Sequence, residues 1–387
     1  MRAGEPMTST RSTRAIVDLA SLERNWRLLS AAHAKGRIMT VLKANAYGHG
    51  MVPVARFLQG LGQPLFGVAL LDEALALRHA GITGRILVLG PPEPGSLPLY
   101  AREGIEATVP SLAHLREAIA AAAEGALAVH LKCDTGMGRI GLREDARDEL
   151  RALLHEANAL QVRGVYSHLA DSEQLDSDFC ETQLERYEAW CAAIAEALPG
   201  RPFERHLANS GGLLRDARFH FDYARVGFAL WAPLAFSPPE QAPALTARLE
   251  QPLTVRTRVS LVKTMRTGET VGYGRTYRCS ADEVIATLPV GYGDGYFRNL
   301  GNRGAVVLAG KRRPIVGRVS MDQTTVSLGQ DSCQPGDEAI LLGGGPEGIA
   351  AAELGAWAST IDYEVFTNVA ARVPREYVYD SQPIPEP

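Results

Sequence analysis

Residues 37–50 read RIMTVLKANAYGHG, and this stretch holds the pattern from which the fold is predicted. A short apolar run ends at Lys43, and a loop with a tyrosine, a histidine and two glycines follows at once. Apolar runs of this length, bounded by loop residues, are typical of buried strands. Lysine is rarely buried in proteins, so this lysine either extends its ammonium group to water or has a chemical role.

Eight runs of this kind occur between residues 37 and 231, and segments of helical composition and period lie between them. The eight runs are 37–43, 65–70, 85–90, 105–110, 127–134, 162–169, 203–210 and 223–231. Eightfold alternation of strands and helices predicts a (β/α)8 TIM barrel, an α/β fold. A doubly wound open sheet is the competing interpretation, because periodicity does not show closure. Its usual GxGxxG fingerprint is missing after the first strand.

The composition changes near residue 245. Short runs rich in Val, Ile and Thr, separated by Gly, Pro and Asp, predict a mostly antiparallel β domain with one helix over 351–360. We therefore expect a barrel domain over residues 1–245 and a β-rich domain over residues 246–387. Within residues 1–20, the stretch TRAIVDLA (13–20) has the pattern of a strand that could pair with the second domain.

Composition limits the classes of function. The 387 residues have a net charge of −4, with 46% hydrophobic and 22% charged residues, as in soluble globular proteins. No Lys/Arg tract is interleaved with aromatic residues, so we expect neither nucleic acid nor an anionic membrane as a partner. No run approaches the roughly 20 apolar residues that cross a bilayer, and no apolar run follows the first residues, so we expect no secretory signal. The five cysteines have no CxxC spacing, so we expect a cytoplasmic protein without a metal site.

The unusual polar residues fall at the ends of the predicted strands, where TIM barrels place their active sites. Lys43 ends the first strand, residues 132–139 follow the fifth, and His168 ends the sixth. ANSGG (208–212) follows the seventh and RVGF (225–228) lies in the eighth, where barrels commonly bind phosphate. A lysine on one strand and a phosphate cup across the rim indicate pyridoxal phosphate (PLP), whose aldehyde binds lysine.

At these motifs the chain resembles the alanine racemases, a family of PLP-dependent, barrel-type amino-acid racemases. VLKANAYGHG is similar to the PLP attachment motif of that family. The resemblance continues through DTGMGRIG (134–141), YSHLADSE (166–173), HLANSGG (206–212), RVGFALW (225–231), VGYGRTY (271–277), GYGDGY (291–296), GRVSMDQ (317–323) and IDYEVF (361–366). It implies an isomerase that interconverts L-alanine and D-alanine by two-base proton transfer at Cα, either for peptidoglycan synthesis or for alanine breakdown.

The resemblance also implies a role for each matching residue. Lys43 would bind PLP as a Schiff base and serve as one base, and Tyr273 from the partner subunit would be the second. His168 and Arg225 would assist Tyr273, and Arg225 would face the pyridine nitrogen. The implied cofactor-binding set is completed by Tyr47, His168, Asn209, Ser210, Gly227, Phe228 and Tyr363. The implied substrate-binding residues are Arg139, Met321, Asp322 and Tyr292, with Arg298 and Arg318 at the entry channel.

Two further expectations come from the same resemblance. Lys132 matches a position that can be carbamylated, which would give an anion that orients Arg139. The second base comes from the partner subunit, so the protein is expected to be a homodimer with shared active sites.

Three alternatives remain at this point. A serine, lysine or broad-specificity racemase differs from an alanine racemase by pocket size rather than by chemistry. A PLP-dependent decarboxylase of similar architecture would place a carboxylate, not Arg225, at the pyridine nitrogen. A barrel protein that carries PLP without catalysis would lack the second domain. Ser320, where the family often has cysteine, and Gly293, where alanine is usual, leave the outer channel and side-chain preference open.

Overall fold

The computed structural model describes residues 10–123, 125–157 and 159–383, which form two compact units. One unit comprises residues 22–46 and 51–250. The other comprises the described residues up to Ser21, residues 47–50 and the described residues from 251 onward. The chain therefore enters the second unit three times. Residues 1–9, which belong to the predicted first domain, lie outside the described residues.

The first unit is built on eight parallel strands, so the predicted TIM barrel is confirmed. They pair in the order β8-β7-β6-β5-β4-β3-β2-β9. Between the two end strands of this order, the Arg225 amide donates to the Ala208 carbonyl at 2.9 Å, so the barrel is nearly closed. The strands are β2 (Ile38–Val41), β3 (Leu65–Val68), β4 (Arg85–Val88), β5 (Glu106–Val109), β6 (Ala128–Lys132), β7 (Gln161–Tyr166), β8 (Glu204–His206) and β9 (Ala224–Val226).

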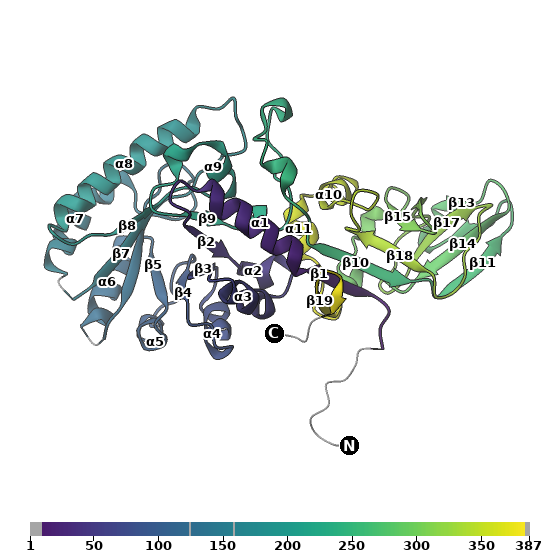
Figure 1. Ribbon diagram of the computed structural model, residues 1–387, viewed down its shortest axis with the longest axis horizontal. Helices are drawn as coiled ribbons and strands as arrows, with labels where there is room; N and C mark the ends of the chain where they lie inside the picture. Colours follow the sequence, from purple (N-terminus) through teal and green to yellow (C-terminus); the bar gives the residue numbers. More distant parts are fainter. Residues whose placement is uncertain (1–9, 124, 158, 384–387) are drawn as a thin grey trace, which may run out of the picture. The chain divides into compact units, whose positions relative to one another are not determined.

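Helices alternate with these strands along the chain (Figure 1). Every residue of β2, β3 and β5 is buried, as expected for parallel strands that are covered on both faces. Ser111 caps α6 as its position in the sequence predicts, since its side chain accepts a hydrogen bond from the His114 amide. The helices are α1 (Leu19–Ala32), α3 (Met51–Gly60), α4 (Leu71–His79), α5 (Leu97–Glu103), α6 (Leu112–Ala122), α7 (Arg147–Glu156), α8 (Phe179–Ala197) and α9 (Ser210–Arg215).

Two barrel strands are much shorter than predicted. The run 203–210 forms a strand only over β8, because Asn209 caps helix α9 and ends the extended backbone. The run 223–231 forms a strand only over β9, and a 3-10 helix, η3 (Phe228–Leu230), replaces its second half. In both places apolar residues continue past the strand, so composition alone does not mark the end.

The second unit is mostly β. Its main sheet has the order β16-β15-β18-β10-β1-β19-β20, and β11-β14-β17 and β12-β13 form smaller sheets. β1 pairs antiparallel with β10 and parallel with β19 (Figure 1). Its elements are β1 (Arg14–Asp18), β10 (Leu253–Arg258), β11 (Leu261–Met265), β12 (Thr270–Val271), β13 (Tyr277–Arg278), β14 (Glu283–Leu288), β15 (Ala305–Leu308), β16 (Lys311–Pro314), β17 (Thr324–Gly329), β18 (Glu338–Leu342), β19 (Arg375–Tyr379), β20 (Gln382–Pro383), α10 (Ala351–Ala358) and α11 (Asp362–Thr367).

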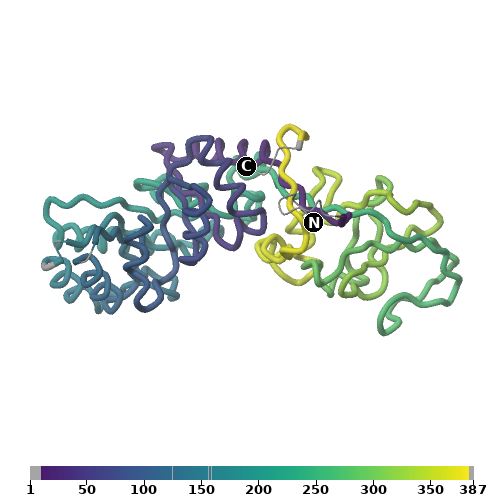
Figure 2. Tube along the Cα trace, turned by 90° about the horizontal axis from the view of Figure 1, so that it is seen from below, coloured from purple at the N-terminus to yellow at the C-terminus, as the bar shows by residue number. Residues whose placement is uncertain are grey.

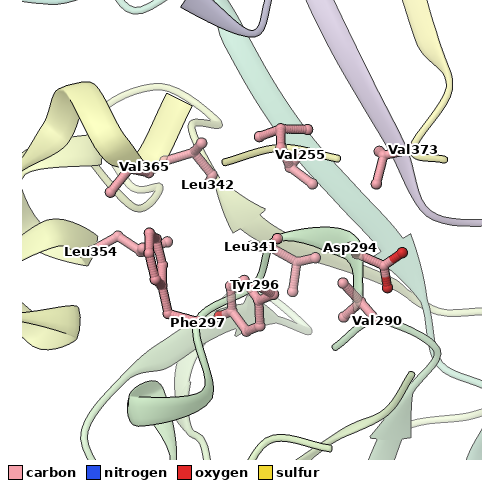
Figure 3. Close-up of a pocket in the computed structure, with 12 residues that line it drawn as sticks. Val255, Val290, Asp294, Tyr296, Phe297, Leu341, Leu342, Leu354, Val365 and Val373 are labelled. Atoms are coloured by element: carbon pink, nitrogen blue, oxygen red, sulfur yellow. The ribbon is translucent and has the colours of Figure 1, made fainter. Parts of the chain in front are cut away.

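Side chains from several of these segments pack together in the core of the second unit. The tube in Figure 2 runs from green to yellow through this unit after its purple N-terminal strand. A cavity of about 30 Å³ remains in the core, and Figure 3 shows that its labelled lining is aliphatic and aromatic apart from Asp294. Among the described residues, the buried Tyr296 hydroxyl at this cavity has no hydrogen-bond partner. A space of this size holds only about one or two waters, so it is part of the core and not a substrate site.

None of the helices in the described ranges is long and apolar enough to cross a membrane.

Candidate active site

Lys43 follows the end of β2, where the backbone turns into a short left-handed helix, α2 (Lys43–Tyr47). Ala44, Asn45 and Ala46 have φ values of 52°, 56° and 53° and ψ values near 50°, with Tyr47 at φ 50°. This conformation costs roughly 1–2 kcal/mol for each residue other than glycine. Specific contacts must therefore hold the turn, and strain of this kind is typical of functional sites.

Two side chains hold the left-handed turn. Glu73, in the first turn of α4, accepts a hydrogen bond from the Ala44 amide at 2.7 Å. The Asn45 side-chain oxygen accepts from the Met51 amide at 2.8 Å, at the start of α3. The backbone on both sides of the turn is thus tied to barrel helices. Lys43 is presented from a fixed turn, not from the flexible loop that two nearby glycines suggest.

Four cationic side chains surround His168 at this rim of the barrel. Burial, and then the charges of Arg225, Lys132, Arg139 and Lys43, hold the pKa of His168 well below its usual value. Its Nδ1 lies 3.3 Å from Nη2 of Arg225. His168 is therefore a neutral imidazole at neutral pH, and its Nδ1 accepts the arginine hydrogen. The excess of positive charge suits an anionic ligand.

Both lysines at the rim have lowered pKa values. Burial and then the charge of Arg139 lower the pKa of Lys43, while Glu73 opposes them. Lys132 is 4% exposed, and burial followed by the charge of Arg225 holds its pKa well below the usual value. Desolvation disfavours a charged ammonium, so each lysine is more readily a neutral amine than an exposed lysine is. A neutral amine is the form that attacks carbonyl carbon.

Arg225 is fixed by the ends of the neighbouring strands. It lies within β9 and is 4% exposed. Its guanidinium donates to the carbonyl oxygens of Ser167 at 2.6 Å, His206 at 2.7 Å and Leu207 at 3.0 Å. A buried arginine with so many acceptors has one orientation, so the direction of its remaining donors is set by the barrel.

The predicted phosphate cup is partly assembled. The Ser210 hydroxyl accepts hydrogen bonds from the Gly227 amide at 3.1 Å and from the Ala229 amide at 3.3 Å. The loops after β8 and β9 therefore meet at Ser210. Phe228 follows at the first position of η3. The Asn209 side-chain oxygen caps α9, so this residue shapes the loop.

In the second unit, the predicted residues with large, mainly apolar side chains include three that are exposed to solvent. Tyr273 is 71% exposed, Met321 is 54% exposed and Tyr292 is 43% exposed. Large apolar side chains at this exposure are unusual enough to indicate a binding surface when they gather. Tyr273 begins a 3-10 turn, η6 (Tyr273–Arg275), and Tyr292 begins another, η7 (Tyr292–Asp294).

Residues 317–322 lie against the backbone of the segments that carry these exposed side chains. The Tyr292 amide donates to the Ser320 carbonyl at 3.0 Å. On the other side, a Cβ on Gly272 would lie 3.2 Å from the Arg318 amide nitrogen, so the turn before Tyr273 packs closely on this segment. Tyr273, Tyr292 and Met321 are therefore carried on adjoining backbone segments.

Two contacts within the second unit involve residues that were predicted for the site. Asp322 accepts from Arg372 Nη2 at 2.8 Å, so its carboxylate is already paired. The rings of Tyr47 and Tyr363 are 6.3 Å apart, which brings two predicted phosphate ligands together. The predicted residues thus divide between the units. The barrel holds Lys43, Lys132, Arg139, His168, Asn209, Ser210, Arg225, Gly227 and Phe228, and the second unit holds Tyr47, Tyr273, Tyr292, Arg298, Arg318, Met321, Asp322 and Tyr363.

A buried group next to Arg225 was not predicted. His206, His130 and Glu106 lie in the barrel core and are hydrogen-bonded to one another. The sequence does contain a signal for them. His130 stands two residues before Lys132, so both side chains lie on the same face of β6 in an otherwise apolar run.

Comparison with known proteins adds an independent result. Residues 17–234 match the family model of the alanine racemase N-terminal domain, and residues 252–377 match that of the C-terminal domain. An alanine racemase of Symbiobacterium thermophilum is 42% identical over 372 residues, covering 95% of this chain and 97% of the relative. An alanine racemase of Carboxydothermus hydrogenoformans is 40% identical over 376 residues, covering 94% of this chain and 99% of the relative.

Solved structures give the same result. The alanine racemase of a D-cycloserine-producing Streptomyces lavendulae has a TM-score of 0.90 at 36% identity, covering 96% of this chain and 98% of that one. The alanine racemase of Bacillus anthracis with bound L-Ala-P has a TM-score of 0.89 at 34% identity, covering 98% of each chain.

Proposed function

Because the chain belongs to the alanine racemase family, we propose that it interconverts L-alanine and D-alanine with PLP as its cofactor. The observation that supports this best is the barrel rim, where Lys43 and three other cations surround a neutral His168. The rim offers an amine for an aldehyde, and positive charge for a phosphate ester and a carboxylate. An alternative in which a barrel alone carries PLP is not favoured, because the second domain matches the family as well.

The residues at the rim fit PLP. Lys43 would hold its aldehyde carbon, and its lowered pKa favours the neutral amine that this bond requires. Ser210, with the amides beside it, would hold the phosphate, and Tyr47 and Tyr363 would add their hydroxyls. Arg225 would donate to the pyridine nitrogen. When bound, PLP would withdraw electrons from Cα of the amino acid and so acidify its proton.

Racemisation needs a proton removed from one face of Cα and another returned to the opposite face. We assign the first face to Lys43 and the second to Tyr273, since one base does not reach both faces of a planar carbon. Tyr273 is 71% exposed in a single chain, which suits a residue that completes the site of a partner subunit. His168 is neutral and its Nδ1 accepts from Arg225, so its ring proton is on Nε2, and this N–H would donate to the tyrosine oxygen and help it act as a base.

Arg225 also limits the reaction to racemisation. A guanidinium donates and does not give up its proton at any working pH, so the ring nitrogen opposite it stays unprotonated. Electron withdrawal from Cα would then be moderate, which would favour return of the proton to Cα. The buried carbonyls that hold Arg225 keep this donor in place.

Substrate binding involves both domains in this proposal. Arg139 is exposed and makes no hydrogen bond or ion pair within the described ranges, so its guanidinium is available for the alanine carboxylate. Met321, Asp322 and Tyr292 would close the site from the partner. We accordingly assign most of the cofactor binding to residues 1–245, and Tyr363 and the partner contribution to residues 246–387, in a cytoplasmic homodimer.

The test is a chiral assay of the purified protein with L-alanine, L-serine and L-lysine in parallel. D-alanine as the dominant product is the expected result. Comparable D-serine or D-lysine would keep the mechanism and contradict the substrate, and no D-product from protein that retains PLP would refute the proposal. Lys35→Ala, at an exposed lysine paired with Asp222, serves as a control for substitution of a lysine elsewhere on the barrel.

A further inference from the structure

A line of buried hydrogen bonds crosses the barrel from Arg225 to the opposite end. Nη1 of Arg225 lies 3.0 Å from Nδ1 of His206, and Nε2 of His206 lies 2.9 Å from Nδ1 of His130. Nε2 of His130 lies 2.8 Å from Oε2 of Glu106, and Nε of Arg85 lies 2.6 Å from Oε1 of Glu106. Glu106 and Arg85 are the first residues of β5 and β4, so the line ends at the N-terminal mouth of the barrel.

The chemistry of the donors gives this line one direction. Arginine only donates, so Nδ1 of His206 accepts and the single proton of its neutral ring is on Nε2. That proton is donated to Nδ1 of His130, whose own proton is then on Nε2 and is donated to the Glu106 carboxylate. Every partner is consistent with this arrangement. If the direction of these hydrogen bonds were reversed, the donors of Arg225 would face the Nδ1–H group of His206, and no hydrogen bond could form between them.

We propose that Glu106 and His130 are positioning residues for catalysis, which act through His206 to hold Arg225 toward the cofactor. This inference rests on the proposed function. We call the four residues Glu106, His130, His206 and Arg225 the relay. The carboxylate at its far end makes each successive imidazole a better acceptor, so the hydrogen bond that reaches Arg225 is strengthened.

Burial and charge support this role. His130 and His206 are 0% exposed and Glu106 is 3% exposed. Burial by itself would raise the pKa of Glu106, but hydrogen bonds from His130 and Arg85 lower it to about 2. Burial, followed by the charge of Arg225, keeps the pKa of His206 well below its usual value. A fixed negative charge and a fixed positive charge are therefore joined through the buried rings of His130 and His206, of which His206 is kept neutral.

The surrounding residues hold the two rings in place. The His206 ring is stacked between Tyr166, at 4.7 Å and 7°, and Tyr223, at 4.5 Å and 22°. On β7, a Cβ at Gly164 would lie 2.2 Å from Nδ1 of His130. Gly164 does not have a positive φ, so the glycine is required there for space and not for backbone freedom. The barrel thus leaves room for an imidazole at this position.

A purely structural role is the competing explanation, and Glu204 offers a matched control. Glu204 is also bonded to Arg85, at 2.8 Å, and its loss removes the same charge from the same mouth of the barrel. Within the described part of the chain, it contacts no imidazole of the relay. If the network merely stabilises the barrel, Glu106→Gln and Glu204→Gln should have similar effects.

The first readout is the tautomeric state of the histidines in the cofactor-free protein. It is measured by ¹⁵N NMR of protein whose imidazole nitrogens are labelled. We expect Nε2–H tautomers for His130 and His206 in the parent protein and in Glu204→Gln. In Glu106→Gln we expect the His130 signals to show a mixture of tautomers. Unchanged tautomers in Glu106→Gln would overturn the proposal.

The second readout is the ratio of two products, pyruvate and D-alanine, that the PLP-loaded protein forms from L-alanine. Alanine can also pass its amino group to PLP and, after water adds at Cα, leave as pyruvate. We expect Glu106→Gln to raise the ratio of pyruvate to D-alanine and to lower kcat by about tenfold to a hundredfold, with little change for Glu204→Gln. Equal effects of the two variants would refute the relay, whereas absence of D-alanine from the parent would refute the proposed function instead.

A second pair of variants covers the case in which Glu106→Gln does not fold. A glutamine at position 130 can accept from His206 through its oxygen and donate to Glu106 through its nitrogen, so His130→Gln keeps the direction of the relay. His130→Leu removes both contacts at similar volume. We expect His130→Gln to keep the ratio of pyruvate to D-alanine of the parent protein, and His130→Leu to raise this ratio. The same ratio in both variants would contradict the inference.

Discussion

Lys43 combines three features that an ordinary surface lysine lacks. It follows a buried strand, it stands at the head of a left-handed turn, and its pKa is lowered by burial and by Arg139. We expect Lys43→Ala to abolish the absorbance of lysine-bound PLP and to reduce racemisation by roughly 10³-fold or more. Lys35→Ala should change neither quantity, because that lysine is paired on the surface with Asp222. Turnover that survives in Lys43→Ala would remove this lysine from the mechanism.

Lys132 carries the second prediction at the residue scale. Its amine is buried 4.6 Å from the centroid of the Tyr166 ring, and burial and Arg225 keep its pKa well below the usual value. A neutral amine adds to carbon dioxide and releases a proton, which would convert the buried neutral amine into an anion near Arg139 and Arg225. We expect a carbamate signal in ¹³C NMR after addition of ¹³C-bicarbonate at neutral pH, and its loss in Lys132→Ala. A signal that persists in that variant would belong to another lysine.

At the scale of single elements, α2 is the most unusual feature. Ala44 is exposed and left-handed, so glycine there relieves steric strain, whereas valine adds a branched side chain where it is least tolerated. We expect Ala44→Gly to leave the free energy of unfolding unchanged or up to about 1 kcal/mol higher, and Ala44→Val to lower it by more than about 1 kcal/mol. Urea denaturation measures both.

The matched control for this prediction is an exposed alanine in a right-handed helix. Ala192 lies in α8, where glycine costs about 1 kcal/mol relative to alanine. Ala192→Gly should therefore destabilise the protein, opposite in sign to Ala44→Gly. Destabilisation of equal size by both glycines would mean that the left-handed turn is not strained.

The barrel elements were predictable where apolar runs end at charged or glycine residues. β3 and β5 are short, continuous and buried, and Ser111 caps the helix that follows β5. The left-handed α2 was not predictable, because alanine and asparagine have no local preference strong enough to impose it. Its cause is tertiary, namely the hydrogen bond that Glu73 accepts from the Ala44 amide and the one that the Asn45 side chain accepts from the Met51 amide. The ends of β8 and β9 were missed for a related reason, since the chain turns there to bring Ser210 to Gly227.

The part of the site that lies in recognisable sequence motifs was predictable. Lys43 and His168 were predicted at the ends of strands and Arg225 within the eighth strand, and the structure brings the three to one rim. Glu106 and His130 were not named, because a charged residue inside a strand acquires a partner only when the barrel closes. The geometry of a closed sheet determines which inward-facing residues meet.

At the scale of the whole molecule, the predicted catalytic residues belong to two compact units of one chain. Lys43 is in the barrel and Tyr273 is in the second unit, where its ring is 71% exposed. A tyrosine that serves as a base needs a partner for its hydroxyl and shelter from water. An assembly of two chains, in which each second unit completes the site of the other barrel, would supply both.

Mixed dimers test this assembly directly. A heterodimer of Lys43→Ala and Tyr273→Phe chains, purified through two different tags, would contain one site with both substitutions and one site with neither. We expect it to recover about half of the parent activity, although each homodimer is nearly inactive. Lys43→Ala combined with Arg139→Leu is the control, because both residues belong to the barrel and no intact site can form. If the first heterodimer is as inactive as its parents, each chain builds its own site, and Tyr273 does not act across the dimer.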